Sequence, residues 1–182
     1  MNTPPQHSGQ VGPDVPAGLA ERVVAELGGN AATVVTAESL TAGLVVARLA
    51  DVPGASSCVL GGFVTYATDQ KTRLLGVPRE VIATYTVVSA EVALAMAEGA
   101  LRATGADLAV ATTGAAGPAE LDGHPPGTVF VALATAEGAS LVRGCVGASR
   151  LRGGRAEVRE ATVDVALRLI EDVLSNPRVP HT

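Results

Sequence analysis

The chain has 182 residues, of which 47% are hydrophobic, 2% aromatic and 17% charged, and its formal net charge is −5. This length fits one domain, whose core has to be built from Ala, Val, Leu and Ile. An acidic chain without a basic stripe and with few aromatic side chains is not expected to bind nucleic acid. No segment reaches the roughly 20 apolar residues of a membrane span, and the start lacks an apolar signal core. We therefore expect a cytoplasmic protein with no nucleic-acid or membrane partner.

Side chains that bind metals are few and scattered. Two Cys and three His residues stand apart in the sequence, and none has the close spacing of a metal-ligand set. Cys58 and Cys145 lie inside apolar runs, and a cytosol keeps such thiols reduced. We expect no metal, no cofactor and no structural disulfide.

The first half of the chain predicts a tail followed by alternating helices and strands. Residues 1–16 are polar and rich in Pro and Gly, which predicts a disordered tail before a single domain over 17–176 and a flexible C-terminus over 177–182. Pro16 suits the first position of a helix that runs to about residue 27. A buried strand is expected over 31–37 and a helix over 41–50. In the strand predicted over 58–68, Gly61 and Gly62 indicate a bulge or a close backbone approach.

The second half adds further helices and a hairpin. A short helix or turn is expected over 69–75 and another after Pro78, and Ser89 is a good N-cap for a helix that runs to about residue 103. A strand over 107–112 precedes a long loop over 113–127, a hairpin of strands over 128–135 and 139–146, and a last helix over 154–174. This order predicts an α/β fold, a three-layer α/β/α sandwich with a mixed, partly parallel sheet.

The segment from Ala37 to Gly43 joins the first predicted strand to a helix through mostly small residues. Free backbone N–H groups at a helix start attract anions, so this turn could hold a phosphate or a developing oxyanion. Ser39 lies where it could attack a substrate, and Glu38 places a carboxylate beside it. The alternative is that Ser39 is an ordinary N-cap.

Lys71 is the only lysine among the 13 Lys and Arg residues. Arg stays protonated in proteins, whereas a desolvated Lys can lose its proton. If the chain uses a lysine as a base, Lys71 is the one candidate. The alternative is a solvated helix charge next to Tyr66, with the tyrosine packed in the core.

Two further segments could contact a ligand. The loop that begins at Thr113 and Gly114 follows a strand and offers hydroxyl and backbone N–H groups. Arginines cluster before and at the start of the last helix, at positions 150, 152, 155 and 159, where guanidinium groups suit a phosphate or carboxylate. A plain connection and a solvated charge cluster are the alternatives. Both loops that follow strands could meet at the carboxyl edge of the sheet, where α/β proteins usually bind ligands.

Six short motifs follow one another within about residues 19 to 174. They are Ala37-Glu38-Ser39-Leu40-Thr41-Ala42-Gly43, Val52-Pro53-Gly54-Ala55-Ser56, Gly61-Gly62-Phe63-Val64-Thr65-Tyr66 with Lys71, Val88-Ser89-Ala90-Glu91-Val92, Thr113-Gly114-Ala115-Ala116-Gly117-Pro118 and Pro126-Gly127-Thr128-Val129. In this order they resemble the CinA C-terminal domain family, the nicotinamide-nucleotide amidohydrolases that deamidate nicotinamide mononucleotide.

The resemblance implies an amidase site. By position, Ser39 is similar to the family's nucleophile and Lys71 to the base that activates it. The predicted substrate-binding residues are Glu38, Thr41, Gly43, Tyr66, Thr113, Gly114, Arg152 and Arg155. The chain departs from the family pattern with Leu40 in place of Cys, Ala42 in place of Gly, Thr68 in place of Asn and Gly154 in place of Asp.

The reaction that the resemblance implies is hydrolysis of nicotinamide mononucleotide to nicotinate mononucleotide and ammonia, in pyridine nucleotide salvage, by a Ser–Lys mechanism without a metal. A small-molecule nucleotide would be the substrate, and a stand-alone, cytoplasmic homodimer is expected. Two alternatives stay open. One is a module that binds a nucleotide without cleaving it, and the other is an interaction protein of competence or DNA-damage responses.

Overall fold

The structure, a computed structural model, describes residues 18–175. The tail expected over 1–16 and the C-terminus expected over 177–182 lie outside the described residues. The helices are α1 Leu19–Gly29, α2 Leu44–Ala50, α3 Thr68–Leu75, α4 Arg79–Tyr85, α5 Ala90–Thr104 and α6 Arg155–Ser175, with short 3-10 helices η1 Ala55–Ser57 and η2 Gly147–Ser149. The strands are β1 Val34–Glu38, β2 Val59–Val64, β3 Leu108–Gly114, β4 Val129–Thr135 and β5 Ser140–Cys145.

The strands form one five-stranded sheet in the order β2-β1-β3-β4-β5. β1 runs parallel to β2 and β3, whereas β4 runs antiparallel to both β3 and β5. The predicted α/β fold with a mixed, partly parallel sheet is confirmed, as is the late hairpin. Because β1, β2 and β3 are parallel, their carboxyl ends meet at one edge of the sheet.

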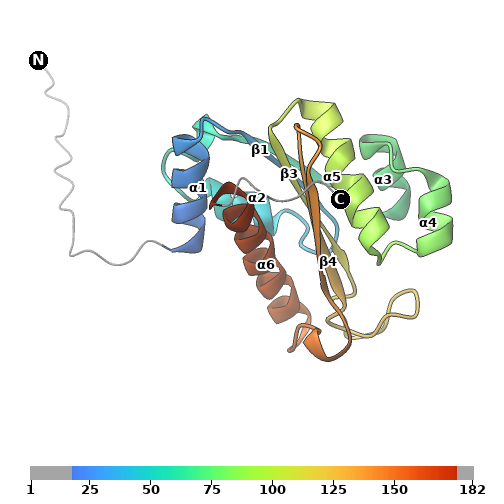
Figure 1. The fold of residues 1–182 in the computed structure, drawn as a ribbon. Helices are drawn as coiled ribbons and strands as arrows, with labels where there is room; N and C mark the ends of the chain where they lie inside the picture. Colours follow the sequence, from blue (N-terminus) through green and yellow to red (C-terminus); the bar gives the residue numbers. More distant parts are fainter. Residues whose placement is uncertain (1–17, 176–182) are drawn as a thin grey trace, which may run out of the picture.

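Helices cover both faces of the sheet (Figure 1), which completes the predicted three layers. α1, α2 and α6 lie on one face, and α3, α4 and α5 lie on the other. The face under α6 is lined by larger side chains such as Val131 and Leu133, and the face under α5 by alanines such as Ala109 and Ala132. These small residues let α5 pack closely on the sheet, so the interior is filled without large aromatic side chains.

The contact between α5 and α3 is equally close. A Cβ atom on Gly99 of α5 would overlap the backbone carbonyl group of Leu75, the last residue of α3. Glycine is therefore the residue that fits, and α5 fixes the position of α3. This matters for the site because α3 carries Lys71.

Several predicted boundaries differ from the structure. β1 begins at Val34 rather than at residue 31, and β3 continues to Gly114 rather than ending at residue 112. α1 begins at Leu19 rather than at Pro16, which itself lies outside the described residues. α2 begins at Leu44 rather than at residue 41, because Ala42 and Gly43 have left-handed backbone conformations, with φ of 52° and 96°, that interrupt a right-handed helix. β2 ends at Val64 rather than at residue 68, since α3 already begins at Thr68.

The two glycines of β2 accompany the predicted bulge and a close approach, although the approaching group is a side chain rather than a backbone. The pairing with β1 joins Val34 to Val59 and then Val35 to Gly61, which leaves Leu60 out of register as a bulge. A Cβ atom on Gly62 would collide with the side chain of Thr36 in β1.

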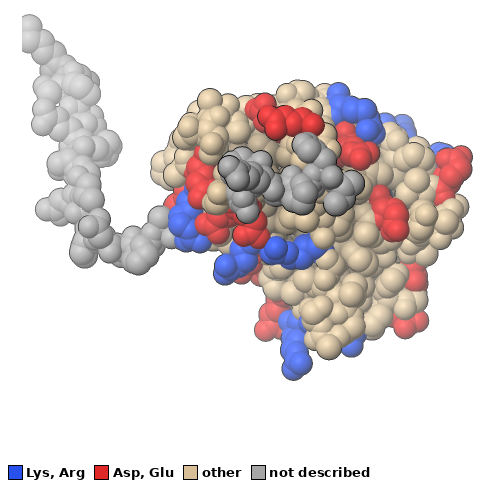
Figure 2. Space-filling view, viewed as in Figure 1, with Lys and Arg blue, Asp and Glu red and all other residues tan. Residues whose placement is uncertain are grey.

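Charged side chains of both signs are interspersed on the face of the molecule drawn in Figure 2. This face carries no basic stripe of the kind that binds nucleic acid. Among the helices of residues 18–175, none combines the length and apolar character that crossing a membrane requires.

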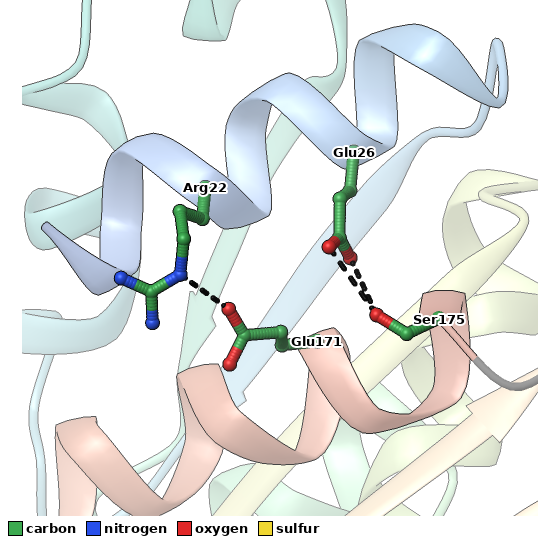
Figure 3. A network of polar contacts seen from close by, with 4 residues as sticks. All are labelled: Arg22, Glu26, Glu171 and Ser175. Carbon is green, nitrogen blue, oxygen red and sulfur yellow. Dashed lines mark hydrogen bonds and ion pairs between the residues drawn. The ribbon is translucent and has the colours of Figure 1, made fainter. Parts of the chain in front are cut away.

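α1 and α6 lie side by side and share polar contacts (Figure 3). Arg22 Nε lies 2.7 Å from Glu171 Oε1, and Ser175 Oγ lies 3.2 and 3.3 Å from the two carboxylate oxygens of Glu26. The Arg22–Glu171 pair is partly exposed, so water screens it and it contributes little to stability. Apolar packing of buried residues such as Leu27 and Ile170 does more to hold the two helices together.

Candidate active site

Ser39 and Lys71 lie side by side at the carboxyl edge of the sheet. Ser39 directly follows β1, and its N–H group donates to the carbonyl oxygen of Thr112 in β3 at 3.0 Å. Lys71 lies in α3, which follows β2, the parallel neighbour of β1. Its Nζ atom lies 2.9 Å from Ser39 Oγ and 2.7 Å from the carbonyl oxygen of Thr65. A hydroxyl group and an amine thus meet although the residues are 32 positions apart.

The side chain of Lys71 is buried, with 1% of its surface exposed. Burial disfavours the ammonium form and lowers the pKa of Lys71 to about 8. Among residues 18–175, no carboxylate forms an ion pair with Lys71 that would restore its charge. The neutral amine, which can accept a proton, is therefore accessible near neutral pH. The alternative of a solvated helix charge is excluded by this burial.

Glu38 lies under the turn that carries Ser39 and is fully buried. Its carboxylate accepts hydrogen bonds from the N–H groups of Gly43, Val45 and Val46 at 2.8–3.1 Å, and from Thr36 Oγ1 at 3.0 Å. The protein's own carboxylate therefore occupies the N–H groups at the start of α2, where the sequence led us to expect a phosphate or an oxyanion. These three donors are not available to a ligand, and the charge of Glu38 holds the turn.

Thr41 and Gly43 also support the turn rather than line a cavity. Thr41 is fully buried, and its Oγ1 atom lies 2.7 Å from Thr112 Oγ1, which ties the turn to β3. Gly43 precedes α2 and gives its N–H group to Glu38. Neither residue, nor Glu38, reaches the cavity described next.

A cavity of about 460 Å³ opens beside Ser39 and Lys71. Of the residues predicted from sequence, the cavity is lined by Ser39, Tyr66, Lys71, Thr113, Gly114 and Arg155. Its volume lies in the usual range of small-molecule pockets. Ser39, Tyr66 and Gly114 follow or end three neighbouring parallel strands, as the carboxyl-edge expectation requires.

Tyr66 and Arg155 form one wall of this cavity. Tyr66 is 56% exposed, which excludes the alternative that it packs in the core. Arg155, the first residue of α6, donates from Nη2 to the Tyr66 hydroxyl group and from Nη1 to the carbonyl oxygen of Gly117 at 2.8 Å. Two protein acceptors thus fix the plane of this guanidinium group. Thr113, which also lines the cavity, donates its hydroxyl hydrogen to the carbonyl oxygen of Val87.

Arg152 lies outside the cavity that contains Ser39. It is exposed and borders a neighbouring hollow of about 380 Å³ together with Arg150. Arg150 itself donates to the carbonyl oxygens of Gly147 and Pro126 at 3.0 and 3.3 Å. Of the predicted arginines, Arg155 is the one that lines the cavity.

Sequence reasoning missed several cavity residues. Val87 lines the cavity from the connection between α4 and α5, and the loop after Pro118 adds Glu120 and Leu121. No sequence signal marks Val87, because its contact with Thr113 spans 26 residues. In the part of the chain that the structure describes, no group of three His, Cys, Asp or Glu side chains could hold a metal ion.

Comparison with known proteins places this chain and its fold in a family. The sequence model of the CinA C-terminal domain matches residues 16–174. The chain belongs to the CinA C-terminal domain family. A CinA-like protein of Mycolicibacterium gilvum is 49% identical over 156 residues, which cover 85% of this chain and 36% of that protein. The present CinA C-terminal domain thus spans about a third of the length of such curated relatives.

Solved CinA structures share the fold over most of their length. The competence/damage inducible protein CihA from Agrobacterium tumefaciens is 39% identical, with a TM-score of 0.80 over 86% of this chain and 93% of that chain. A CinA superfamily protein from Klebsiella pneumoniae is 30% identical, with a TM-score of 0.82 over 87% and 96%. These names refer to competence and damage and state no enzymatic activity.

Proposed function

We propose that this CinA C-terminal domain hydrolyses the carboxamide group of nicotinamide mononucleotide, which yields nicotinate mononucleotide and ammonia for pyridine nucleotide salvage. The observation that carries the proposal is the 2.9 Å contact between Ser39 Oγ and the buried Nζ atom of Lys71 at the wall of a cavity. A serine next to a desolvated amine is the arrangement that activates a hydroxyl nucleophile.

In the first half of the reaction, the neutral amine of Lys71 takes the proton of Ser39 as Oγ attacks the carboxamide carbon. The C–O bond forms and the carbonyl electrons move to oxygen, which gives a tetrahedral intermediate. The Lys71 ammonium group then protonates the leaving nitrogen, the C–N bond breaks, and ammonia departs. The product of this half is an ester between Ser39 and the nicotinoyl group.

In the second half, water replaces ammonia. Lys71, neutral again, takes a proton from water as the hydroxide attacks the ester carbon. The C–O bond to Ser39 breaks and Lys71 returns the proton to Oγ. The carboxylic acid that forms loses its remaining proton to solvent and leaves as the nicotinate carboxylate. The N–H groups bound by Glu38 take no part, so the oxyanion has to be stabilised by other groups of the cavity wall.

Arg155 is the residue that we assign to the 5′-phosphate. Its guanidinium group is exposed at the cavity and already held by Tyr66 and Gly117, so little side-chain freedom is lost when a phosphate binds. Tyr66 and the loop at Thr113 and Gly114 would border the ribose and the ring.

We further propose a cytoplasmic homodimer that pairs through β2, an edge strand. Leu60 and Val64 are 51% and 47% exposed there, and residues 58–68 contain no charged side chain. Edge strands that stay unpaired usually carry charges or Pro. Light scattering of the wild-type protein should give twice the mass of one chain. The Val64→Lys variant should give the mass of a single chain. A wild-type monomer would refute the dimer.

The free, buried thiols of Cys58 and Cys145 support the proposed cytoplasmic location, because a reducing compartment keeps thiols free.

The activity is tested by mass spectrometry of the nucleotide together with an ammonia assay. Wild-type protein should convert the amide to the acid, and Ser39→Ala should not, while exposed Ser56→Ala should keep full activity. Binding of the nucleotide without ammonia release would favour a binding module, which the site residues also allow. Salt-dependent binding to DNA would favour an interaction role in DNA-damage responses.

A further inference from the structure

Arg159 of α6 holds the turn that carries Ser39. Its Nε atom donates to the carbonyl oxygen of Leu40 at 2.9 Å, and its Nη2 atom donates to that of Thr41 at 2.8 Å. We propose that Arg159 is a positioning residue, which keeps Ser39 Oγ in line with Lys71 by fixing the Leu40–Thr41 and Thr41–Ala42 peptide groups of the turn. This inference rests on the proposed amidase function.

The contact is specific to arginine. Two donors in a planar, permanently charged fork match two successive carbonyl oxygens, and hydrogen bonds from a charged donor are stronger than those between neutral groups. Within residues 18–175, Arg159 forms no ion pair with a carboxylate. Its side chain is partly buried, and both of its hydrogen bonds go to the turn.

The turn needs support from outside because its own backbone is unfavourable. Ala42 has a left-handed conformation, with φ of 52°, which a residue with a Cβ atom adopts at a cost. Glu38 binds the N–H groups of the turn and of the start of α2, and Arg159 binds the carbonyl groups on its other side. The backbone around Ser39 is therefore held through both its donors and its acceptors.

α6 links the nucleophile to the proposed phosphate contact. Arg155 and Arg159 are four residues apart and so lie on the same side of the helix. Arg155 reaches the cavity wall, whereas Arg159 reaches the Ser39 turn and does not line the cavity. Substitution of Arg159 should thus affect the chemical step more than substrate binding.

The test compares three variants of the full chain in the ammonia assay. Arg159→Met keeps the apolar stem but removes both donors. If the turn then moves by about 1 Å, kcat should fall about 100-fold, while KM should change less than about threefold. Arg159→Lys, which retains a charge and can reach one carbonyl group, should recover about tenfold. Arg48→Met is the matched control, because Arg48 joins α2 to Glu160 of α6 at 2.7 Å without touching the turn. It should keep activity within about twofold.

A second readout does not depend on the substrate. The rate at which a small sulfonyl fluoride labels Ser39, with Ser39→Ala as the blank, should fall at least about tenfold in Arg159→Met and stay unchanged in Arg48→Met. If wild-type protein is labelled but releases no ammonia, the amidase proposal fails, and the labelling rates still decide the role of Arg159. A folded Arg159→Met protein with wild-type kcat or a wild-type labelling rate overturns the inference. A wild-type Ser39 that resists the reagent overturns both proposals.

Discussion

Lys71 donates a hydrogen bond to the carbonyl oxygen of Thr65, 2.7 Å from Nζ. This contact engages one N–H group of the amine, and in the neutral form the lone pair can then face Ser39 Oγ, 2.9 Å away. In the ammonium form every position on Nζ is a donor, so Ser39 can accept a hydrogen bond but cannot give up its proton. In the proposed mechanism, the protonation state of Lys71 therefore decides whether Ser39 is activated.

The rate of ammonia release should follow the titration of Lys71. Burial lowers the pKa of Lys71 to about 8, and in the proposed mechanism the neutral form is the active one. We expect kcat/KM to rise about tenfold per pH unit below pH 8 and to level off above it. Initial rates between about pH 6 and pH 9.5 measure this profile. A flat profile over this range would show that the base is not a group with this pKa.

Lys71→Met should stabilise the folded protein at neutral pH while it removes activity. The pKa of Lys71 is about 8 in the folded state, against about 10.4 in an unfolded chain. Between about pH 8 and about pH 10.4, Lys71 is mostly protonated in the unfolded chain and mostly neutral in the folded protein, so the free energy of unfolding of wild type rises with pH. Below about pH 8, Lys71 is charged in both states, and the folded protein bears the full cost of burying that charge. We expect Lys71→Met to raise the free energy of unfolding at pH 7 by about 1–3 kcal/mol, with the gain shrinking as pH approaches 10.5.

Urea unfolding of both proteins at several pH values measures this gain. Arg73→Met, an exposed position on the same helix, is the control and should change stability by less than about 0.5 kcal/mol at every pH. If Lys71→Met is less stable than wild type at pH 7, burial of Lys71 does not destabilise the folded protein, and the expectation is wrong.

Thr86→Gly should also stabilise the protein. Thr86 has φ of 65° and ψ of 171°, a backbone region that β-branched residues avoid at a cost of about 1–3 kcal/mol. Its buried hydroxyl group has no hydrogen-bond partner among the described residues. We expect a net gain of about 1 kcal/mol after the larger entropy of a glycine in the unfolded chain is subtracted. Thr84→Gly, an exposed position in α4, should instead lose a few tenths of a kcal/mol. Thermal unfolding of both variants measures this difference. Equal losses of stability in Thr86→Gly and Thr84→Gly would contradict the strain argument.

Arg155→Met should weaken recognition of the phosphate. We expect KM for nicotinamide mononucleotide to rise at least about tenfold, because a charge-assisted pair with the phosphate is lost. KM for the riboside, which lacks the phosphate, should change little. Arg152→Met provides the comparison, since Arg152 lies outside the cavity. A larger rise in KM for Arg152→Met than for Arg155→Met would indicate that the phosphate binds in the neighbouring hollow.

Apolar periodicity and turn residues were sufficient to predict the order of helices and strands. The Val-rich run of β1 and the single glycine that ends α5, Gly105, are local signals, so they can be recognised in one sequence. The glycine pair in β2 also indicated its bulge, because a missing Cβ atom has few other uses in a strand.

The direction of individual side chains at the site was not predictable in this way. Glu38 ends a strand next to Ser39, and nothing local distinguishes a carboxylate that faces a ligand from one that faces the N–H groups of its own helix. Arg152 and Arg155 are three residues apart in the sequence. α6 begins at Arg155, so Arg155 has a fixed helical position whereas Arg152 lies in the preceding loop. Contacts such as Arg159 with Leu40 span more than 100 residues and exist only once the layers are packed.

The space that Gly99 leaves for Leu75 has a consequence for natural variation in this chain. A mutation to alanine or serine at position 99 would force α3 outward, and the amine at its centre would move with it. Activity would then be lost through a residue of a neighbouring helix that does not line the cavity. Variants at this glycine should accordingly be grouped with variants of Ser39 and Lys71.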